Sequence, residues 1–426
     1  MPFALLKERA ESGHVLIIAP SSLFRRARAK RYLRRNELRF AEVVRRGANG
    51  ASELRSLDRA ALTFGPGGAG FGPLARLALA ILTRRPFAQL AATVMPRVLL
   101  VVHAPSAPAA RWLGVPPPTE LPLTPSFVMS LSVDHDRAYV YWFAPEGHGP
   151  SAVTKIGLTT AGGERVTREA AALRLVASGA RVGAVEIPQL LHTTRIGAAP
   201  ALLESFVDGA SAATVIARQP HRMTNLVNEL AGWLERWGVA TSAAVADRRK
   251  LVDATLLQPL ESVAGHLPDE FLQAVNRDAG RLLTVPLKAT AAHNDLTMWN
   301  VLVRADGSLG VLDWEAATAA ALPLADLFYA VADAACAASG YVGRREALRA
   351  CFCADGKLAG WARMVVKRHV QALEVGNDEV SLSFRSCWLQ HAADDVRRGR
   401  DQGFLGMLLD VANSPETFWP VTGDGD

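Results

Sequence analysis

The sequence predicts an α+β fold in which a part built from short strands precedes a mostly helical part. An apolar strand at residues 152–157 is followed by a helical segment at 165–176 and a second apolar strand at 201–209. Beyond these strands, apolar residues recur at helical spacing in 224–237 and 361–373, where core packing is the simplest interpretation. The two kinds of periodicity occupy different stretches, so we expect a strand-rich lobe and a helical lobe.

The first part of the chain differs in charge from the rest. Residues 1–120 hold 19 Lys and Arg against 7 Asp and Glu, a balance of +12, which leaves −6 for residues 121–426 because the whole chain carries +6. The basic residues concentrate in 21–35, a predicted helix capped by Ser21 or Ser22. Such a helix could contact anionic lipid, nucleic acid or an acidic partner, although a solvated helix face is the simpler interpretation.

Residues 65–72 contain a Gly-x-Gly-x-x-Gly pattern, which invites a dinucleotide-binding interpretation. That site needs an acidic residue about twenty positions later, and the next Asp or Glu is Glu120, so a flexible turn is the better account. Residues 98–102 predict a strand, and the Pro-rich stretch 105–125 predicts a linker. We therefore expect an extra N-terminal α/β segment over residues 1–120, to which the sequence assigns no role.

Composition favours a cytoplasmic enzyme. Half of the 426 residues are hydrophobic and 21% are charged, enough for a large core and two or three domains. The longest apolar stretches, 74–82 and 87–103, are interrupted by Arg or Pro, so neither predicts a membrane span. The N-terminus lacks the features of a signal peptide. The four cysteines lack the paired spacing of a zinc site, and buried packing is expected for Cys351 and Cys353.

A group of polar residues around an apolar hairpin carries most of the predicted chemistry. Asp295 lies five residues before Asn300, and Asp313 follows two short apolar runs, 301–303 and 309–312, that are separated by an Asp-Gly turn. The hairpin brings Asn300 beside Asp313, and both offer the oxygen ligands that Mg²⁺ prefers. One base and two metal ligands are the groups that ATP-dependent phosphoryl transfer requires.

The loop before this hairpin supplies the predicted catalytic residues. Asp295 is placed to accept the proton of an attacking hydroxyl, and His293 to brace the loop through hydrogen bonds. A purely structural interpretation remains for each residue alone, because Asp295 could cap a turn and Asp313 could simply end a strand. The joint spacing with Asn300 favours the catalytic interpretation.

This stretch resembles the catalytic loop and metal-binding segment of the aminoglycoside phosphotransferase and choline kinase family, relatives of the protein kinases. The family pattern is His-x-Asp-x-x-x-x-Asn, then a hydrophobic strand and an Asp. Four residues match it position by position: His293, Asp295, Asn300 and Asp313. Asn294 stands where the family usually has Gly. The chain is most similar to bacterial members whose substrates are largely unassigned.

The resemblance covers roughly residues 125–400 and implies a two-lobed protein-kinase-like fold. The antiparallel-sheet N-lobe would occupy residues 121–208, and the helical C-lobe with the catalytic and metal loops would occupy 209–426. In the C-lobe, the resemblance implies that Asp326 is a loop-bracing carboxylate. The extra segment 1–120 would precede both lobes.

In the N-lobe the resemblance implies a nucleotide site. Lys155 on the strand would hold the phosphates, and Glu169 on the following helix would orient that Lys. Backbone groups from Glu204 to Phe206 would bond the adenine edge. The nucleotide-covering loop, 133–137, departs from the usual pattern because it has no glycine, and its carboxylates would repel a triphosphate unless a metal ion or its Arg offsets them.

The implied activity is transfer of the γ-phosphoryl group of ATP, with Mg²⁺, to a hydroxyl of a small molecule of the aminoglycoside, sugar or amino-alcohol type. Helices after the metal loop would supply the acceptor cleft, and four of their residues are candidates: Trp361, Arg368, His369 and Trp388. One alternative is a catalytically weak, kinase-like nucleotide-binding regulatory module, motivated by the glycine-free loop. A nucleic-acid-binding protein, motivated by the basic run Arg25 to Arg35, is a weaker alternative.

Overall fold

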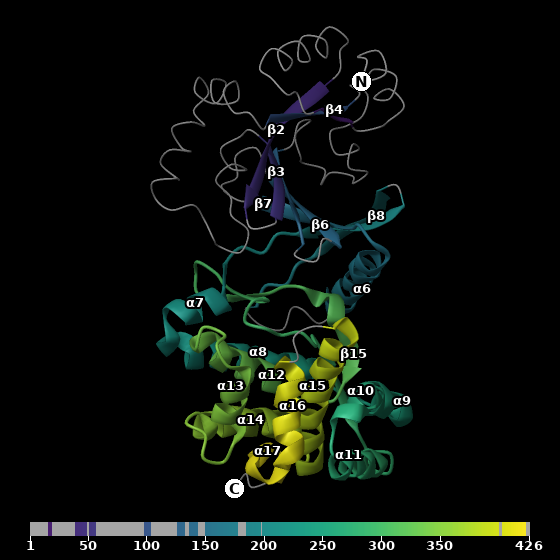
Figure 1. Cartoon of the computed structure of the whole chain (residues 1–426), viewed down its shortest axis with the longest axis vertical. Helices are drawn as coiled ribbons and strands as arrows, with labels where there is room; N and C mark the ends of the chain where they lie inside the picture. Colours follow the sequence, from purple (N-terminus) through teal and green to yellow (C-terminus); the bar gives the residue numbers. More distant parts are fainter. Residues whose placement is uncertain are drawn as a thin grey trace. The chain divides into compact units, whose positions relative to one another are not determined.

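The chain divides into two compact units, which Figure 1 shows in the colours of the sequence. The first holds residues 1–173 and 188–208, and the second holds 174–187 and 209–426. The computed structural model describes residues 16–18, 39–48, 51–56, 98–103, 126–132, 136–143, 150–177, 185–196, 198–399 and 403–422. The predicted basic helix 21–35, the glycine-rich stretch 65–72 and the Pro-rich stretch 105–125 lie outside the described residues.

The first unit is built on a nine-stranded sheet in which every pair of neighbouring strands is antiparallel. Its order is β1-β4-β2-β3-β5-β6-β7-β9-β8. The strands are β1 (Leu16–Ile18), β2 (Arg39–Ala48), β3 (Ala51–Ser56), β4 (Val98–His103), β5 (Ser126–Leu131), β6 (Arg137–Phe143), β7 (Pro150–Gly157), β8 (Leu190–Ile196) and β9 (Ala199–Ser205). Strands from the N-terminal segment therefore continue the sheet, because β3 pairs with β5.

Helix α6 (Thr160–Ala177) follows β7 and begins five residues before the predicted start at 165. Its first turn contains Gly162 and packs against the chain near Asp136, where a Cβ atom on Gly162 would lie 2.0 Å from the Asp136 carbonyl oxygen. The Gly162 amide donates to the Thr159 hydroxyl at 3.1 Å, which caps the helix. Only glycine permits this close approach.

The second unit is mainly helical and includes two small three-stranded sheets, β10-β13-β14 and β11-β12-β15. The strands are β10 (Ala210–Ser211), β11 (Ala243–Ala244), β12 (Lys288–Ala292), β13 (Val301–Val303), β14 (Leu309–Val311) and β15 (Thr318–Ala321). The helices are α7 (Ala212–Arg218), α8 (Met223–Thr241), α9 (Arg248–Val252), α10 (Gln258–Val263), α11 (Asp269–Leu282), α12 (Ala325–Ala338), α13 (Arg344–Phe352), α14 (Ala359–Leu373), α15 (Asn377–Arg398), α16 (Gly403–Asn413) and α17 (Trp419–Thr422). The predicted hairpin and the helices predicted at 224–237 and 361–373 are confirmed as β13-β14, α8 and α14.

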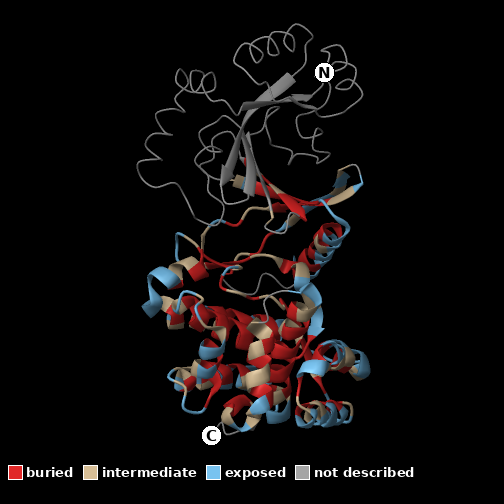
Figure 2. Ribbon diagram, in the orientation of Figure 1, coloured by how far each residue is buried: buried red, intermediate tan, exposed pale blue. Residues whose placement is uncertain are grey.

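Helix α12 forms the centre of the second unit, where Figure 2 shows most residues buried. All thirteen residues from 325 to 337 are buried. Aromatic side chains from neighbouring helices surround it, as at Phe328, which meets Phe352 and Phe384 at ring-centroid distances of 5.6 and 5.1 Å. The four cysteines are buried and free, which includes Cys351 and Cys353, for which burial is expected.

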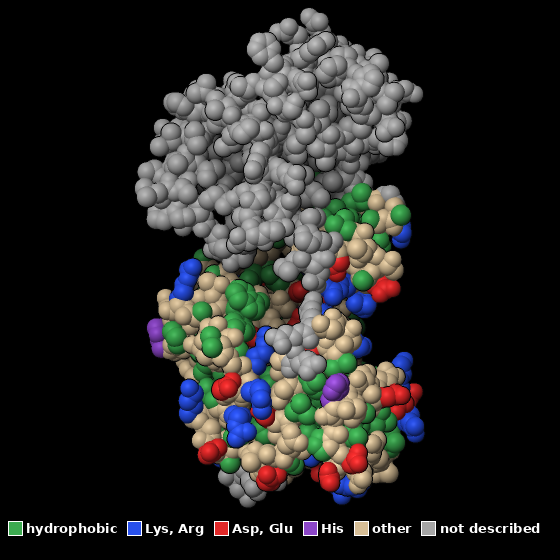
Figure 3. Space-filling view, viewed as in Figure 1, with side chains coloured by type: hydrophobic (Ala, Val, Ile, Leu, Met, Phe, Trp, Pro, Cys, Tyr) green, Lys and Arg blue, Asp and Glu red, His purple; other side chains and the backbone are tan. Residues whose placement is uncertain are grey.

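The surface of the second unit carries charges of both signs. On the face drawn in Figure 3, basic and acidic side chains are interspersed, with hydrophobic side chains between them. Within the part of the chain that the structure describes, no helix has the length and apolar character needed to cross a bilayer.

Candidate active site

The loop between β12 and β13 closes on itself and presents Asp295 and Asn300 together. Asn300 donates through Nδ2 to the Asp295 carbonyl oxygen at 2.8 Å and to its carboxylate at 3.4 Å. The amides of Asn300 and Val301 donate to the Thr297 carbonyl oxygen at 3.0 and 3.2 Å, which makes one helical turn. The loop therefore places the carboxylate and the carboxamide side by side, as the spacing predicts.

His293 lies beneath this loop and is fully buried. Its Nε2 contacts the Leu312 carbonyl oxygen at 2.9 Å, and its Nδ1 accepts from the Asp295 amide at 3.2 Å. Because a carbonyl can only accept and an amide can only donate, Nε2 is the donor and Nδ1 the acceptor in these two contacts. It also packs on Trp314, with ring centroids 4.7 Å apart. His293 thus ties the loop to the hairpin, which fits the bracing role expected for it.

Asp326, at the start of α12, holds the beginning of the loop. Its carboxylate accepts from the backbone amides of His293 at 2.6 Å and Asn294 at 2.8 Å. Asn294 has φ 62°, in the left-handed region where glycine is favoured and Asn is the best-tolerated alternative. The replacement of the family's Gly by Asn294 is therefore compatible with the loop, and the bracing role implied for Asp326 is confirmed.

The hairpin carries Asp313 to the same end as Asn300. Val301 pairs with Val311, and the Leu312 amide donates to the Asn300 carbonyl oxygen at 2.8 Å. Asp313 follows directly in a left-handed conformation, with φ 63° and ψ 62°. A non-glycine residue in this region is strained, and such strain is frequent at functional sites.

The pKa of Asp295 is shifted by its burial and by nearby carboxylates. Burial, and then the negative charges of Asp313 and Glu315, raise the pKa of Asp295 to about 7. The Asp313 and Glu315 carboxylates therefore disfavour the ionised form of Asp295. A cation held here would offset that repulsion.

The donor set fits Mg²⁺ bound together with phosphate oxygens. Because Asn300 uses Nδ2 on Asp295, its carboxamide oxygen is the atom left for a cation, and the hairpin brings Asp313, which has a carboxylate, to the same end. Among the residues that the structure describes, no three His, Cys, Asp or Glu side chains are grouped to hold a metal alone. Magnesium in phosphoryl-transfer sites commonly has one or two protein carboxylate ligands and completes its shell with water and phosphate.

A second buried carboxylate on α12, Asp333, was not singled out from the sequence. It accepts from the Met298 amide at 2.7 Å and the Tyr341 hydroxyl at 3.0 Å, and its other oxygen lies 3.6 Å from Arg344 Nη1. Burial raises its pKa. An Asp inside an otherwise apolar helix was the signal that could have found it, because a buried carboxylate needs strong partners.

The first unit brings Lys155 and Glu169 together, as expected. Lys155 Nζ lies 2.5 Å from Glu169 Oε1 and 3.0 Å from Glu204 Oε1. All three residues are buried, with exposed fractions of 6%, 0% and 3%. Lys155 pairs with Leu202 in the sheet, so Glu204, two residues further along β9, points to the same face. The side chain of Glu204 is thus part of the Lys155 cluster, which sequence reasoning missed.

The backbone near Glu204 is largely engaged inside the sheet. The Ser205 amide donates to the Gln189 carbonyl at 2.9 Å, and the Phe206 amide donates to the Ser151 carbonyl at 3.1 Å. The adenine contact expected between Glu204 and Phe206 stays a prediction, to which these two N–H groups do not contribute in this structure.

Asp136, in the glycine-free loop, is buried and paired. It accepts from the Ser132 hydroxyl at 2.8 Å and lies 3.3 Å from Arg165 and 3.6 Å from Arg137. Burial alone would raise its pKa, but the Ser132 hydrogen bond and the two arginines lower it overall. The charge of Asp136 is therefore balanced locally, by Arg165 in addition to the expected Arg137.

Comparison with known proteins decides the family. The phosphotransferase enzyme family matches residues 136–365, more than half of the chain. The chain belongs to this family. No curated protein matches it.

Among solved structures, the GDP complex of wild-type aminoglycoside 2'-phosphotransferase-IIIa is 14% identical, with a TM-score of 0.42, over 67% of this chain and 90% of that one. A thermostable mutant of APH(4)-Ia with ADP and hygromycin B is 12% identical, with a TM-score of 0.43, over 70% and 94%. APH(3'')-Id from Streptomyces rimosus is 15% identical, with a TM-score of 0.38, over 63% and 92%.

In this phosphotransferase, the four acceptor-cleft candidates from the later helices take part in packing. His369 and Trp388 are buried, with exposed fractions of 4% and 0%. Trp361 donates to Asn228 Oδ1 at 3.2 Å, and Arg368 lies 2.9 Å from Glu235. The contacts of these side chains are with their own helical unit, which favours the core-packing interpretation.

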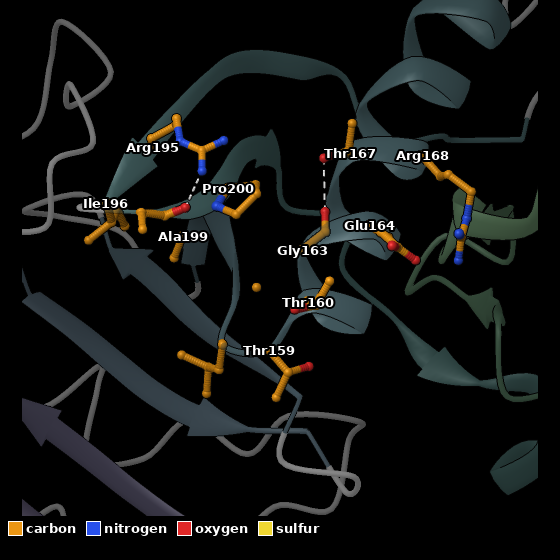
Figure 4. A pocket seen from close by; sticks show the side chains of 13 residues that line it. Thr159, Thr160, Gly163, Glu164, Thr167, Arg168, Arg195, Ile196, Ala199 and Pro200 are labelled. Carbon is orange, nitrogen blue, oxygen red and sulfur yellow. Dashed lines mark hydrogen bonds between the residues drawn. The ribbon is translucent and has the colours of Figure 1, made fainter.

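The first unit of the phosphotransferase also has a hollow of about 970 Å³ between the end of β7, the start of α6 and the β8-β9 hairpin. Figure 4 shows Thr160, Thr167, Arg168 and Arg195 around it. Neither Lys155 nor Glu169 lines it. The hollow is therefore separate from the Lys155 cluster.

Proposed function

We propose that this phosphotransferase moves the γ-phosphoryl group of ATP to a hydroxyl of a small molecule. The observation that carries the proposal is the grouping of Asp295, Asn300 and Asp313 at one end of a braced loop and hairpin. This grouping supplies a proposed base and two proposed cation ligands, and their residue types and their order in the chain are those of the family pattern. An aminoglycoside, a sugar or an amino alcohol fits as the acceptor.

Asp295 is the proposed base. Its carboxylate would accept the proton of the acceptor hydroxyl as that oxygen attacks phosphorus, and a pKa of about 7 matches proton transfer near neutral pH. His293 and Asp326 hold the backbone on either side of Asn294, so the Asp295 carboxylate is positioned by groups that do not react. Positioning of this kind is the main contribution of a protein to phosphoryl transfer.

Asn300 and Asp313 are the proposed magnesium ligands. When bound, Mg²⁺ neutralises charge on the phosphates. The hairpin keeps the two residues at one end, and Asn300 is hydrogen-bonded to Asp295, which links the position of the proposed base to that of a proposed cation ligand.

The remaining roles concern the nucleotide. We propose that Lys155 holds its phosphates and that Glu169 orients Lys155, with Glu204 as a second carboxylate on the same ammonium group. Backbone groups between Glu204 and Phe206 would meet the adenine edge.

The experiment is ATP consumption measured against a panel of hydroxyl compounds, with wild type, Asp295→Asn and the exposed control Asp355→Asn. We expect Asp295→Asn to lose about 10²- to 10⁴-fold in kcat and to keep its affinity for ATP, because only the proton acceptor is removed. The control should match wild type. ATP binding without turnover of any compound by wild type would support a nucleotide-binding regulatory module instead.

A further inference from the structure

Trp299 is the only tryptophan among the described residues that is largely exposed. Its exposed fraction is 56%, whereas Trp142, Trp233, Trp314 and Trp388 have at most 1% exposed. It precedes the proposed cation ligand Asn300 in the catalytic loop. A half-exposed indole beside the proposed reacting groups offers a ligand an apolar face to cover, and covering it would be favourable.

The ring of Trp299 is held against Tyr341. The ring centroids are 5.8 Å apart, with an interplanar angle of 21°. Tyr341 follows the end of α12 with φ 62°, an uncommon conformation for a bulky residue, and its amide donates to the Cys336 carbonyl oxygen at 2.8 Å. The guanidinium of Arg344 lies 5.8 Å from its ring centroid. Backbone and ring of Tyr341 are therefore both fixed before any ligand arrives.

The same buried carboxylate fixes this aromatic pair and the catalytic loop. Asp333 accepts the Tyr341 hydroxyl at 3.0 Å and the Met298 amide at 2.7 Å, and Met298 directly precedes Trp299. Asp333 has an exposed fraction of only 2%. The indole and the reacting groups thus share one brace, so a ligand stacked on the indole keeps a fixed relation to Asp295.

We propose that Trp299 and Tyr341 form a platform that stacks a ring of the acceptor, so that the substrate is a cyclic alcohol. This assignment rests on the proposed phosphoryl transfer and narrows its acceptor. An exposed indole face, with Val342 nearby in the chain at 83% exposed, suits a flat ring with an apolar face, such as a sugar or an aromatic ring. An open-chain amino alcohol offers no such face.

Binding is tested without turnover by ¹⁹F NMR of the full chain labelled with 5-fluorotryptophan, with the Trp299 signal assigned from its loss in Trp299→Phe. The ring probes are methyl glucopyranoside and benzyl alcohol, and the open-chain probes are glycerol, ethanolamine and choline. We expect a ring probe to move the Trp299 signal in a saturable way, also in Tyr341→Phe, but much more weakly in Tyr341→Ala. A signal that no ring probe moves, or that choline or another open-chain probe moves equally, overturns the assignment.

Turnover gives a second and separable test. With a cyclic acceptor that wild type phosphorylates, Trp299→Ala should raise the KM for that acceptor by about tenfold, and more than it lowers kcat, because stacking contributes to binding. Trp299→Phe should recover most of the loss, and Met364→Ala, which removes an exposed apolar side chain on α14, should leave the KM unchanged. An unchanged KM in Trp299→Ala overturns the platform, whereas a wild type that turns over no acceptor overturns the proposed function and leaves the NMR result to decide the platform.

Discussion

Asp326→Asn is the most direct test of how the loop between β12 and β13 is held. The Asp326 carboxylate accepts two backbone N–H groups, from His293 at 2.6 Å and Asn294 at 2.8 Å, and only 7% of the residue is exposed. The carboxamide has the same shape but turns an NH₂ group towards one of these donors. One charge-assisted hydrogen bond is then lost and one buried N–H is left unpaired, which we expect to lower the free energy of unfolding by about 2–4 kcal/mol.

The loss should be measured by urea unfolding followed by tryptophan fluorescence, with Asp355→Asn at the exposed turn before α14 as the matched control. Hydrogen exchange adds a local readout, because the amides of His293 and Asn294 should lose protection while those in the centre of α12 keep it. Activity should fall as well, since the loop positions Asp295. An unfolding free energy within about 0.5 kcal/mol of wild type would refute the assignment of a bracing role.

The remaining predictions concern buried charge in each unit. Burial, with a smaller effect from Arg368, lowers the pKa of His369 from 6.5 to about 4. Between these values the unfolded chain therefore binds more protons than the folded chain. The free energy of unfolding should decrease by about 2 kcal/mol as the pH falls from 7 to 5. In urea unfolding, His369→Gln should abolish this decrease. Lys155→Met removes the ammonium group shared by two buried carboxylates, Glu169 and Glu204, and should lower the free energy of unfolding by about 3–5 kcal/mol. The double variant with Glu204→Gln should lose less, because one of the two unpaired carboxylates is then removed. An equal loss in the single and double variants would contradict that account.

The features that the sequence predicted correctly are encoded over short distances. The Asp-Gly turn and its flanking apolar runs specify the β13-β14 hairpin, and the spacing from Asp295 to Asn300 specifies a loop that closes through their hydrogen bond. Helical periodicity over 224–237 and 361–373 predicted α8 and α14. In each of these cases the residues that determine the structure lie within a few positions of one another.

The features that were missed depend on contacts between distant segments. Glu204 reaches Lys155 only because β9 pairs with β7, and Tyr341 reaches Trp299 only because α12 returns the chain to the loop between β12 and β13. The sequence predicts the start of α6 at residue 165 and not at Thr160, because Gly162 weakens local helix propensity. Packing against Asp136 nevertheless requires glycine at this position. A single sequence contains no signal for such pairings until the fold is known.

Helix α12 explains how a loop of irregular backbone can be held rigidly. Asp326 and Asp333 are the only charged residues in its buried stretch, and a spacing of seven puts both on one face about 10 Å apart along the axis. One binds the beginning of the loop at His293 and the other binds its end at Met298. Two buried carboxylates would destabilise an apolar helix unless strong donors met them, and the loop amides are those donors. The carboxylates of the helix and the amides of the loop therefore satisfy one another's hydrogen bonds. Asp295 cannot be displaced without disturbing the core of the unit.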